Sequence, residues 1–289
     1  MAGTPGRTRG GVVVTGASTG IGEACALHLA GRGFRVFGGV RKDRDGERLR
    51  SSSNGGVEPL TLDVTDASSI EAAAKEVATA LGERGRLAGL VNNAGIAVAG
   101  PLEFIPIDAL RQQLEVNAVG PVAVSQAFLP MLRRSRGRIV HMGSISGKVS
   151  TPFAGPYCAS KFALEAIADA MRMELKPWGI HVSIVEPGTI DTPIWDKSRA
   201  VADAMLDGAP AEVLELYGSA IPKVQAAAEK TAAAGIAPSE VAGAVFRALT
   251  DARPKARYVV GRDAMVQSAV VRRLPDAARD KLILRFMGL

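Results

Sequence analysis

Residues 12–22 read VVVTGASTGIG and join a β-branched run to a glycine-rich turn. Three consecutive valines are typical of a strand that is buried on both faces. The turn has the spacing Gly-x3-Gly-x-Gly, and a helix is expected to follow from about Gly20 to Arg32. At such a junction the backbone can approach a pyrophosphate, and the helix N-terminus offers free N–H groups. The segment therefore predicts a dinucleotide-binding unit, with an ordinary tight turn as the alternative.

The rest of the chain repeats this alternation of strands and helices. Further strands are expected at residues 35–40, 57–62, 87–91, 138–142, 181–185 and 257–260. Further helices are expected at residues 66–81, 108–134 (kinked at Pro121), 153–176 and 240–250. This order predicts an α/β fold of the Rossmann type, a doubly wound parallel sheet with helices on both faces. No linker or repeat divides the 289 residues, so we expect a single domain, 1–289.

Three segments depart from this alternation. Residues 1–9 are rich in Gly and Arg and are expected to form a flexible tail. Residues 188–237 are Ala-rich and lie beyond the carboxyl end of a strand, which predicts a helical substrate lid. Residues 263–289 are expected to form a basic helical tail. Between residues 253 and 285 the excess of basic over acidic side chains equals the net charge of the whole chain, +6, so the remainder is close to neutral.

Composition argues against several classes of protein. Cys25 and Cys158 are too few for a disulfide framework and indicate a reducing, cytoplasmic compartment. The three histidines cluster with no Cys or acidic motif, so we expect no metal site; His141, near Ser144, is expected to support the site indirectly. The sequence contains no run of about 18 apolar residues, so we expect no membrane span.

The basic tail leaves two interpretations open. It lacks a pattern of stacking aromatics, so we expect no nucleic-acid binding. An amphipathic helix on an anionic membrane would make the protein a peripheral membrane binder. The interpretation that we favour is a helix packed on the subunit or on its symmetry mate.

Tyr157 stands four residues before Lys161, and Ser144 lies thirteen residues upstream of Tyr157. Residues i and i+4 share a helix face, so the Lys161 ammonium is expected beside the Tyr157 hydroxyl. A phenol has a reference pKa of about 10, and a nearby cation favours the phenolate. With Ser144 bonding the same substrate oxygen, the three residues could transfer a proton to or from an alcohol oxygen. Taken alone, a Tyr-x3-Lys pattern is weak, and a chance pairing on one helix is the alternative.

The adenosine end of the cofactor is expected near the end of the second strand. An acidic residue there binds the ribose of NAD, but Val40 occupies the place, and Arg41 and Lys42 follow. A missing carboxylate beside cations favours NADP; NAD and a merely solvated loop are the alternatives. Asp63 and Val64 are expected at the adenine, although Asp63 would equally suit the cap of the next helix.

Together the motifs resemble the short-chain dehydrogenase/reductase superfamily over residues 10–262. The ordered set is Thr15–Gly22, Asp63, Asn92–Gly95, Asn117, Ser144, Tyr157-x3-Lys161 and Pro187-Gly188-x3-Thr192. The segments 33–36, 61–65, 90–96 and 155–161 resemble its retinol and hydroxysteroid dehydrogenase branch. The resemblance implies an NAD(P)-dependent oxidoreductase that interconverts an alcohol and a ketone, assembled as a homodimer or homotetramer.

The resemblance also implies a role for each residue. Tyr157 is the general acid/base, Ser144 positions the substrate oxygen, Lys161 binds the nicotinamide ribose and lowers the tyrosine pKa, and Asn117 holds a water of the proton relay. The cofactor-binding residues are expected to be Gly16, Ser18, Thr19, Gly20, Ile21, Gly22, Arg41, Asp63, Val64, Asn93, Ala94, Gly95, Tyr157, Lys161, Pro187, Gly188, Ile190 and Thr192. Gly143 precedes Ser144 where many relatives have a second serine. Asn117 as a plain buried amide, Ser144 as a turn residue and Thr192 as a helix cap are the alternatives.

The expected substrate pocket is mostly apolar. Its candidates are Ile145–Phe153, Ile194, Trp195, Met205, Leu206, Leu214 and Tyr217. We see no arginine pair placed to clamp a carboxylate or phosphate, which favours a small hydrophobic alcohol or ketone that is steroid- or retinoid-like. The alternative function is a non-catalytic dinucleotide sensor, which could dispense with Tyr157 or Lys161.

Overall fold

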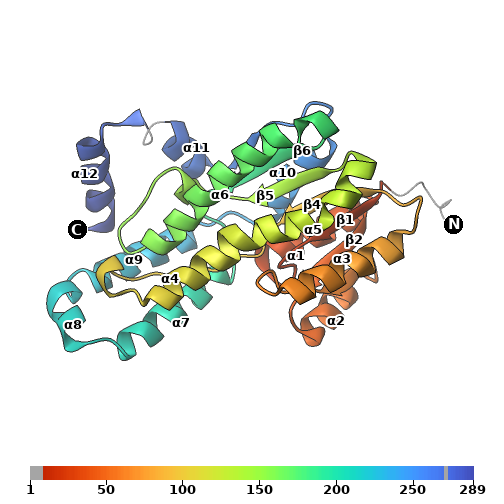
Figure 1. The fold of residues 1–289 in the computed structure, drawn as a ribbon. Coiled ribbons are helices and arrows are strands. Elements are labelled where there is room, and N and C mark those ends of the chain that lie inside the picture. The colour runs from red at the N-terminus through yellow and green to blue at the C-terminus, as the bar shows by residue number, and fades with distance from the viewer. Residues whose placement is uncertain (1–8, 270–272) are drawn as a thin grey trace.

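The computed structural model describes residues 9–269 and 273–289 and contains a seven-stranded sheet (Figure 1). Its strands lie in the order β3-β2-β1-β4-β5-β6-β7, and all neighbours are parallel. The bounds are β1 Gly11–Val14, β2 Arg35–Val40, β3 Val57–Thr61, β4 Leu87–Asn92, β5 Arg138–Met142, β6 His181–Pro187 and β7 Arg257–Val260. The predicted doubly wound sheet is confirmed, and its order reverses between β1 and β4, where such folds bind ligands.

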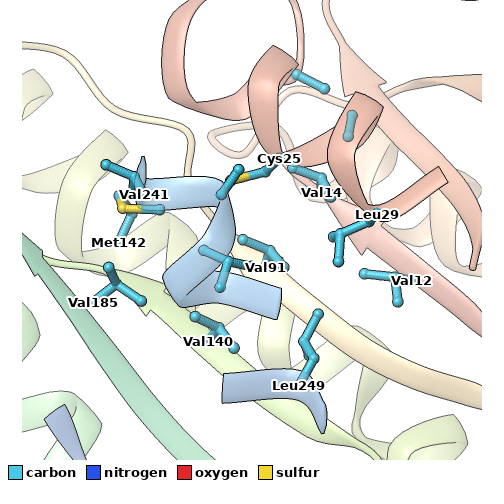
Figure 2. Packing of buried hydrophobic residues seen from close by; sticks show 14 of the residues in the cluster. Val12, Val14, Cys25, Leu29, Val91, Val140, Met142, Val185, Val241 and Leu249 are labelled. Carbon is cyan, nitrogen blue, oxygen red and sulfur yellow. The ribbon is translucent and has the colours of Figure 1, made fainter. Parts of the chain in front are cut away.

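Helices cover both faces of the sheet, as expected from the alternating pattern. The bounds of the covering helices are α1 Gly20–Gly31, α3 Ala67–Leu81, α5 Gly120–Ser135, α6 Gly155–Glu174 and α10 Pro238–Thr250. Val12 and Val14 of β1 belong to the core cluster that contains residues of α1 and α10 (Figure 2). Val13 belongs to the cluster on the other face, with residues of α3 and α5. Successive strand residues point to opposite faces, so the valine run needs a core on each side.

A helix that the hydrophobic pattern did not indicate follows β2. Asp43–Ser52 form α2, where a charged loop was considered. Its buried residues are Gly46 and Leu49, so it presents only a narrow apolar contact to the sheet. A helix with one large buried side chain leaves almost no periodic signal in the sequence.

The predicted helix 108–134 is interrupted before Pro121 rather than at it. Ile107–Leu114 form α4, Glu115–Val119 form one π-helical turn, and α5 begins at Gly120. Pro121 therefore lies in the first turn of α5. Because proline has no N–H, it cannot donate to the Asn117 carbonyl four residues earlier. The observed irregularity is this wider turn just before Pro121, and a kink of the helix axis at Pro121 stays a prediction.

Residues 188–237 contain three helices, α7 Ile194–Asp207, α8 Ala211–Tyr217 and α9 Ile221–Ala233, which extend beyond the sheet (Figure 1). The C-terminal segment contains α11 Arg262–Ala269 and α12 Asp276–Met287, and α12 contacts α9. Residues 1–8 of the predicted tail lie outside the described residues, as do 270–272. Within the described ranges, none of the helices is both long and apolar enough to cross a membrane.

Candidate active site

The turn between β1 and α1 is fastened to the segment that follows β4. Thr15 Oγ1 accepts hydrogen bonds from the backbone N–H groups of Asn93 and Ala94, each at 2.9 Å. Asn93 Nδ2 in turn donates to the carbonyl oxygens of Thr15 (3.0 Å) and Gly16 (3.1 Å). These bonds hold the turn at the edge of the sheet where the strand order reverses.

Two glycines of this turn leave no room for a side chain. Gly16 has φ +64°, and a Cβ there would lie 2.8 Å from Ala94 Cα. A Cβ on Gly22 would lie 2.1 Å from Gly16 O and 2.4 Å from Asn93 Nδ2. Backbone atoms and a hydrogen-bonded amide cannot move aside easily, so both positions require glycine. The turn is therefore shaped for close approach of the backbone to a ligand.

The start of α1 fits the pyrophosphate of a dinucleotide. Thr19 is its N-cap residue, and its side chain makes no capping hydrogen bond with the residues the structure describes. The first N–H groups of the helix and the positive end of its dipole are thus offered to a ligand. Lys197 of α7 brings its Nζ within 3.5 Å of Thr19 Oγ1 and adds a positive charge. Sequence reasoning missed Lys197, because the residue lies far along the chain.

Arg48 of α2 also reaches this turn. Its guanidinium donates to the Ser18 carbonyl and, at 2.6 Å, to the carboxylate of Glu23. Sequence reasoning missed Arg48, because it did not predict the helix Asp43–Ser52 that carries this residue. Arg48 therefore braces the turn that carries Ser18 and Ile21, two of the predicted cofactor residues.

The segment after β6 is held by a residue that the sequence placed in the basic tail. Thr189 N donates to Asp263 Oδ2 at 2.8 Å, and a Cβ on Gly188 would lie 2.3 Å from both Asp263 carboxylate oxygens. Asp263 belongs to α11, so this part of the tail is packed against the Pro187–Gly188 motif. No spacing rule in the sequence connects Asp263 with that motif.

Two further predicted cofactor residues, Gly95 and Ile190, lie in the segments that follow β4 and β6. A Cβ on Gly95 would be 3.4 Å from Asn117 Oδ1. Ile190 bridges to Ile236, and its carbonyl accepts from Trp195 Nε1 at 3.0 Å. Gly95 and Ile190 therefore belong to the segments that border the cofactor turn and the catalytic residues.

Residues after β2 and β3 lie at the place expected for the adenosine end of the cofactor. Arg41 is exposed and lines a surface hollow with Thr61, Asp63 and Asp66. Asp66 is the N-cap of α3, and it accepts from the N–H groups of Ser68 and Ser69.

The alternative role of Asp63 as helix cap is therefore wrong. The Asp63 carboxylate instead accepts from Thr65 N (3.0 Å) and Thr65 Oγ1 (2.8 Å). The neighbouring Val64 carbonyl faces Gly120, where a Cβ would lie at 2.9 Å. Asp63 lines the hollow, whereas Val64 is buried behind it, so the binding of the adenine by these two residues stays a prediction.

Ser144, Tyr157 and Lys161 lie together at the carboxyl end of β5 and the start of α6. Ser144 begins a 3₁₀ turn, Ile145–Gly147, and its Oγ accepts from Ser146 N at 3.1 Å. Ser144 is thus a turn residue as well as a neighbour of Tyr157. Burial raises the pKa of Tyr157, and interaction with the Ser144 hydroxyl opposes this rise. At neutral pH the Tyr157 phenol is therefore protonated.

The Lys161 side chain is buried on the same helix face. Its Nζ lies 5.6 Å from the centroid of the Tyr157 ring and donates to the Met142 carbonyl at 2.8 Å. Burial lowers the pKa of Lys161 to about 8, while the negative charge of Glu165 opposes this shift. The structure thus brings Lys161 to Tyr157, with its ammonium turned to the backbone of β5. That Lys161 lowers the tyrosine pKa remains a prediction.

Asn117 lies in the π turn and holds the segment after β4. Its Oδ1 accepts from Ile96 N at 2.9 Å, and its Nδ2 donates to Ile96 O (3.0 Å) and Ser160 Oγ (3.1 Å). The Asn117 side chain therefore bonds the backbone of a neighbouring segment, as expected if Asn117 is a buried structural amide. That Asn117 holds a relay water remains a prediction.

Gln113, one turn earlier on α4, was missed by sequence reasoning. It is fully buried, its Oε1 accepts from Val98 N at 2.7 Å, and its Nε2 donates to Ile96 O at 2.9 Å. Gln113 and Asn117 are four residues apart, which is the only signal that could have linked them. The two amides bind the same strand-end segment and so join α4 to the active-site edge.

His141 lies inside the protein beside Asn92. Its ring is fully buried, with Nδ1 at 3.4 Å from Asn92 Nδ2. Asn92 also donates to Ser125 Oγ at 2.9 Å, which connects β4 and β5 with α5. Burial, with a smaller effect of Lys161, lowers the pKa of His141 to about 4. A neutral imidazole here is consistent with a supporting role.

An aromatic cluster links the three-helix segment to the catalytic region. The Tyr217 ring of α8 packs edge-on against Phe104 and Phe153, each at 5.9 Å between centroids. Tyr217 Oη donates to Glu103 Oε2 at 2.7 Å. Phe153 has φ +63°, an unusual conformation for a bulky residue, and its carbonyl accepts from Gly100 N at 2.7 Å. Of the predicted pocket residues, Leu214 is 62% exposed and lies outside any enclosed wall.

Comparison with known proteins agrees with this geometry. A family model described as short chain dehydrogenase matches residues 11–203. NADPH-dependent 3-dehydrocapnine reductase of Ornithobacterium rhinotracheale is 36% identical, over 94% of this chain and 95% of the relative. Retinol dehydrogenase 5 of Mus musculus is 34% identical, over 94% and 87%. Mitochondrial D-beta-hydroxybutyrate dehydrogenase of Rattus norvegicus is 35% identical, over 94% and 83%.

Solved structures have the same fold. A short chain dehydrogenase from Burkholderia cenocepacia, crystallised in complex with NADP, is 28% identical with a TM-score of 0.70. The match covers 96% of this chain and 98% of that one.

In the part of the chain that the structure describes, no three His, Cys, Asp or Glu side chains are grouped as metal ligands would be.

Proposed function

Because the chain belongs to the short-chain dehydrogenase/reductase family, near its retinol and hydroxysteroid dehydrogenase branch, we propose that it interconverts a hydrophobic secondary alcohol and its ketone with NAD(P). One observation carries the proposal. Ser144, Tyr157 and Lys161 meet at the sheet edge that also holds the uncapped, glycine-lined turn before α1. A proton-transfer group and a dinucleotide cradle at one edge are what such an oxidoreductase requires.

We propose NADP as the cofactor, with NAD as the alternative. Gly16, Gly20 and Gly22 would hold the pyrophosphate, and Arg41 would face a 2′-phosphate. The absence of an acidic side chain at Val40 supports this choice, because a carboxylate would repel that phosphate. The name of the reductase from Ornithobacterium, which is NADPH-dependent, is consistent with it.

In this proposal the nicotinamide supplies or accepts the hydride, and the protein manages the substrate oxygen. Ser144 binds that oxygen and orients it toward Tyr157. In reduction the Tyr157 hydroxyl donates its proton to the developing alkoxide, and the raised pKa keeps that hydroxyl protonated at neutral pH. In oxidation the phenolate accepts the proton, and the Lys161 charge close to the ring stabilises it.

Apolar and aromatic side chains support a lipophilic substrate. Phe153 lies four residues before Tyr157, and its contact with Tyr217 brings α8 over the catalytic region. We therefore propose that residues 188–237 act as a lid that selects the substrate. Retinol and hydroxysteroid dehydrogenases among the relatives support a steroid- or retinoid-like compound, whereas D-beta-hydroxybutyrate dehydrogenase has a short hydroxy acid in its name. The test must therefore include both kinds of compound.

We also propose a homodimer or homotetramer assembled through the long helices α5 and α6. Val119 beside α5 and Phe162 on α6 are 48% and 43% exposed, although they are large and apolar. Covering such side chains favours association. Sedimentation equilibrium of the purified protein should give a mass at least twice that of one chain. A cytoplasmic location stays a prediction, as does a basic tail packed on the subunit or its symmetry mate, with peripheral membrane contact as the alternative.

The function is tested by following nicotinamide absorbance with NADPH or NADH and a panel of ketones. The panel should contain lipophilic ketones and short keto acids. We expect turnover of lipophilic ketones, and Tyr157→Phe should lower kcat by about 10²- to 10⁴-fold while NADPH still binds. Faster turnover of the keto acids would overturn the substrate class. Tight cofactor binding without turnover of any compound would favour the sensor.

A further inference from the structure

Charged side chains from four segments near the active site meet in one cluster, of which three members are buried and two are partly exposed. We call this group the ion cluster, and its members are Lys148, Glu165, Asp169, Glu186 and Arg257. Ion pairs in the interior are costly to desolvate, so their geometry and further hydrogen bonds decide whether they stabilise the fold. The function proposed above uses none of these five side chains.

Glu165 is the centre of the ion cluster. Its Oε2 accepts from Lys148 Nζ and from Arg257 Nε (3.1 Å) and Nη2 (2.9 Å). Glu186 Oε1 lies 3.5 Å from Lys148 Nζ and 3.1 Å from Arg257 Nε. Arg257 Nη2 also donates to Asp169 Oδ2 at 2.7 Å. The side chains of Glu165 and Glu186 are only 8% and 1% exposed, so two buried carboxyl groups share two cations, the buried Lys148 and the partly exposed Arg257.

Each carboxyl group belongs to a segment that carries the chemistry. Glu165 lies one helical turn after Lys161 on α6, which also carries Tyr157. Glu186 is followed directly by Pro187 and Gly188, whose position Asp263 fixes from the other side.

Lys148 joins the Ser144 turn to the same pair. It follows the 3₁₀ turn Ile145–Gly147, which begins at Ser144. A Cβ on Gly147 would lie 2.9 Å from Lys161 O and 3.1 Å from Glu165 Cγ, so this turn lies directly on α6. The ion cluster thus connects the serine, the tyrosine–lysine helix and the Pro187–Gly188 segment.

Glu165 and Glu186 are two acidic groups that bind the same two cations. Like charges in one site disfavour double ionisation. Burial and the charge of Glu165 raise the pKa of Glu186 to about 7, against the opposing effect of Lys148. Asp169 is different, because Arg257 and Arg172 at the helix surface lower its pKa. Glu186 is therefore the member whose protonation changes near neutral pH.

We propose that Glu165 and Glu186 are positioning residues of the active site, whose carboxyl groups, through the shared cations Lys148 and Arg257, hold the Ser144 turn and the Pro187–Gly188 segment against α6. The groups that face the pair are Lys148 from the 3₁₀ turn, Lys161 and Asp169 from α6, and Arg257 from β7. When Glu186 ionises, repulsion from Glu165 loosens the Pro187–Gly188 segment. The kinetic part of this inference rests on the proposed function, whereas the titration of Glu186 does not.

The deciding variant is Glu186→Gln, whose amide has the size of the protonated carboxyl group and cannot ionise. Asp169→Asn is the matched control, because it removes another carboxylate that binds Arg257 but does not contact Lys148. Carboxyl resonances of ¹³C-labelled glutamate are titrated in the wild type and both variants. The affinity for NADPH is measured at each pH by its fluorescence.

We expect one glutamate of the wild type to titrate at about pH 7, far above the reference of about 4.3 for an exposed glutamate. Glu186→Gln should remove this titration. NADPH affinity should fall several-fold above the transition in the wild type and in Asp169→Asn, and should stay constant in Glu186→Gln. The inference is overturned if no wild-type glutamate titrates between about pH 6 and 8, or if both variants change the profile alike.

Glu165→Gln supplies a second, independent measurement. The Glu165 charge raises the pKa of Lys161 against burial. Without it, the basic limb of the pH profile for ketone reduction should move down by about one pH unit. An unchanged limb in the folded variant would contradict the role of Glu165. If the wild type reduces no ketone, the proposed function fails, but the glutamate titration and NADPH binding still decide the inference.

Discussion

Thr192 lies on Gly20: a Cβ on that glycine would stand 3.1 Å from Thr192 Cγ2. Gly20 starts α1 after the first strand, whereas Thr192 follows the sixth. The contact therefore joins the segments that follow β1 and β6, and these two strands lie on opposite sides of the point where the strand order reverses. Pro193, next in the chain, is the N-cap of α7, so the alternative role of Thr192 as a helix cap is wrong.

Gly22→Ala should abolish cofactor binding and destabilise the protein. The added methyl would lie 2.1 Å from Gly16 O, a backbone atom that can move only with the whole turn. We expect a loss of about 2–4 kcal/mol in the free energy of unfolding. The measurement is urea unfolding together with NADPH titration. Gly31→Ala at the end of the same helix is the control, since nothing lies within 4 Å of its Cβ, and it should change stability by less than about 1 kcal/mol.

Arg41→Ala should weaken NADPH but not NADH. A charge-assisted hydrogen bond to a phosphate contributes about 1.5–3 kcal/mol, so the KM for NADPH should rise by about tenfold or more. Steady-state kinetics with both cofactors measures this difference. Arg44→Ala, whose side chain is 78% exposed in the same charged segment, should leave both KM values within about twofold. An unchanged KM for NADPH in Arg41→Ala would refute the assignment of the phosphate site.

His141 should make the protein sensitive to acid. Its pKa of about 4 in the folded state lies below the ordinary 6.5, so the unfolded chain binds a proton first as the pH falls. The contribution to stability is present above pH 6.5 and is lost as pH falls through 4, at most about 3 kcal/mol. Urea unfolding across this range should show a flatter pH dependence for His141→Gln. His181 is exposed, and burial of part of its ring and the Arg138 charge lower its pKa too, so His181→Gln should change the dependence in the same direction but less than His141→Gln.

Tyr217→Ala should weaken binding of the ketone and leave the cofactor unaffected. The variant loses two edge-on ring contacts, with Phe104 and Phe153, and the hydrogen bond to Glu103. Aromatic pairs contribute about 0.5–1.5 kcal/mol each, so the KM for lipophilic ketones should rise by about three- to tenfold. Leu214→Ala on the same helix is the control, because its side chain is mostly exposed. Equal effects of both variants would contradict a specific role of Tyr217.

The strands and the catalytic helix were predictable because each has a strong local signal. The valine run of β1 is buried on both faces, and α6 carries Tyr157 and Lys161 at helical spacing and ends near Gly179, which has φ +67°. The turn before α1 was predictable for the same reason. Its three glycines stand between a strand and a helix, and such a junction has few structural solutions.

The parts that were missed depend on contacts between distant residues. Lys148, Glu186 and Arg257 come from three segments, and only the folded sheet brings them to Glu165. Arg257 in particular was counted with the basic tail, whereas its charge is neutralised on β7. The helix α2 escaped notice because its contact with the core depends mainly on Leu49.

Because Glu115–Val119 form a π turn, the direction in which Gln113 points relative to α5 depends on the number of residues between them. Deletion of one residue there would restore a regular α-helix and rotate α4 by about 100° relative to α5. Gln113 would then face away from Ile96, although every side chain of the site would still be present. In this stretch the loss of one codon should harm the enzyme more than most substitutions, so gaps in an alignment of relatives would be as informative here as the residue identities.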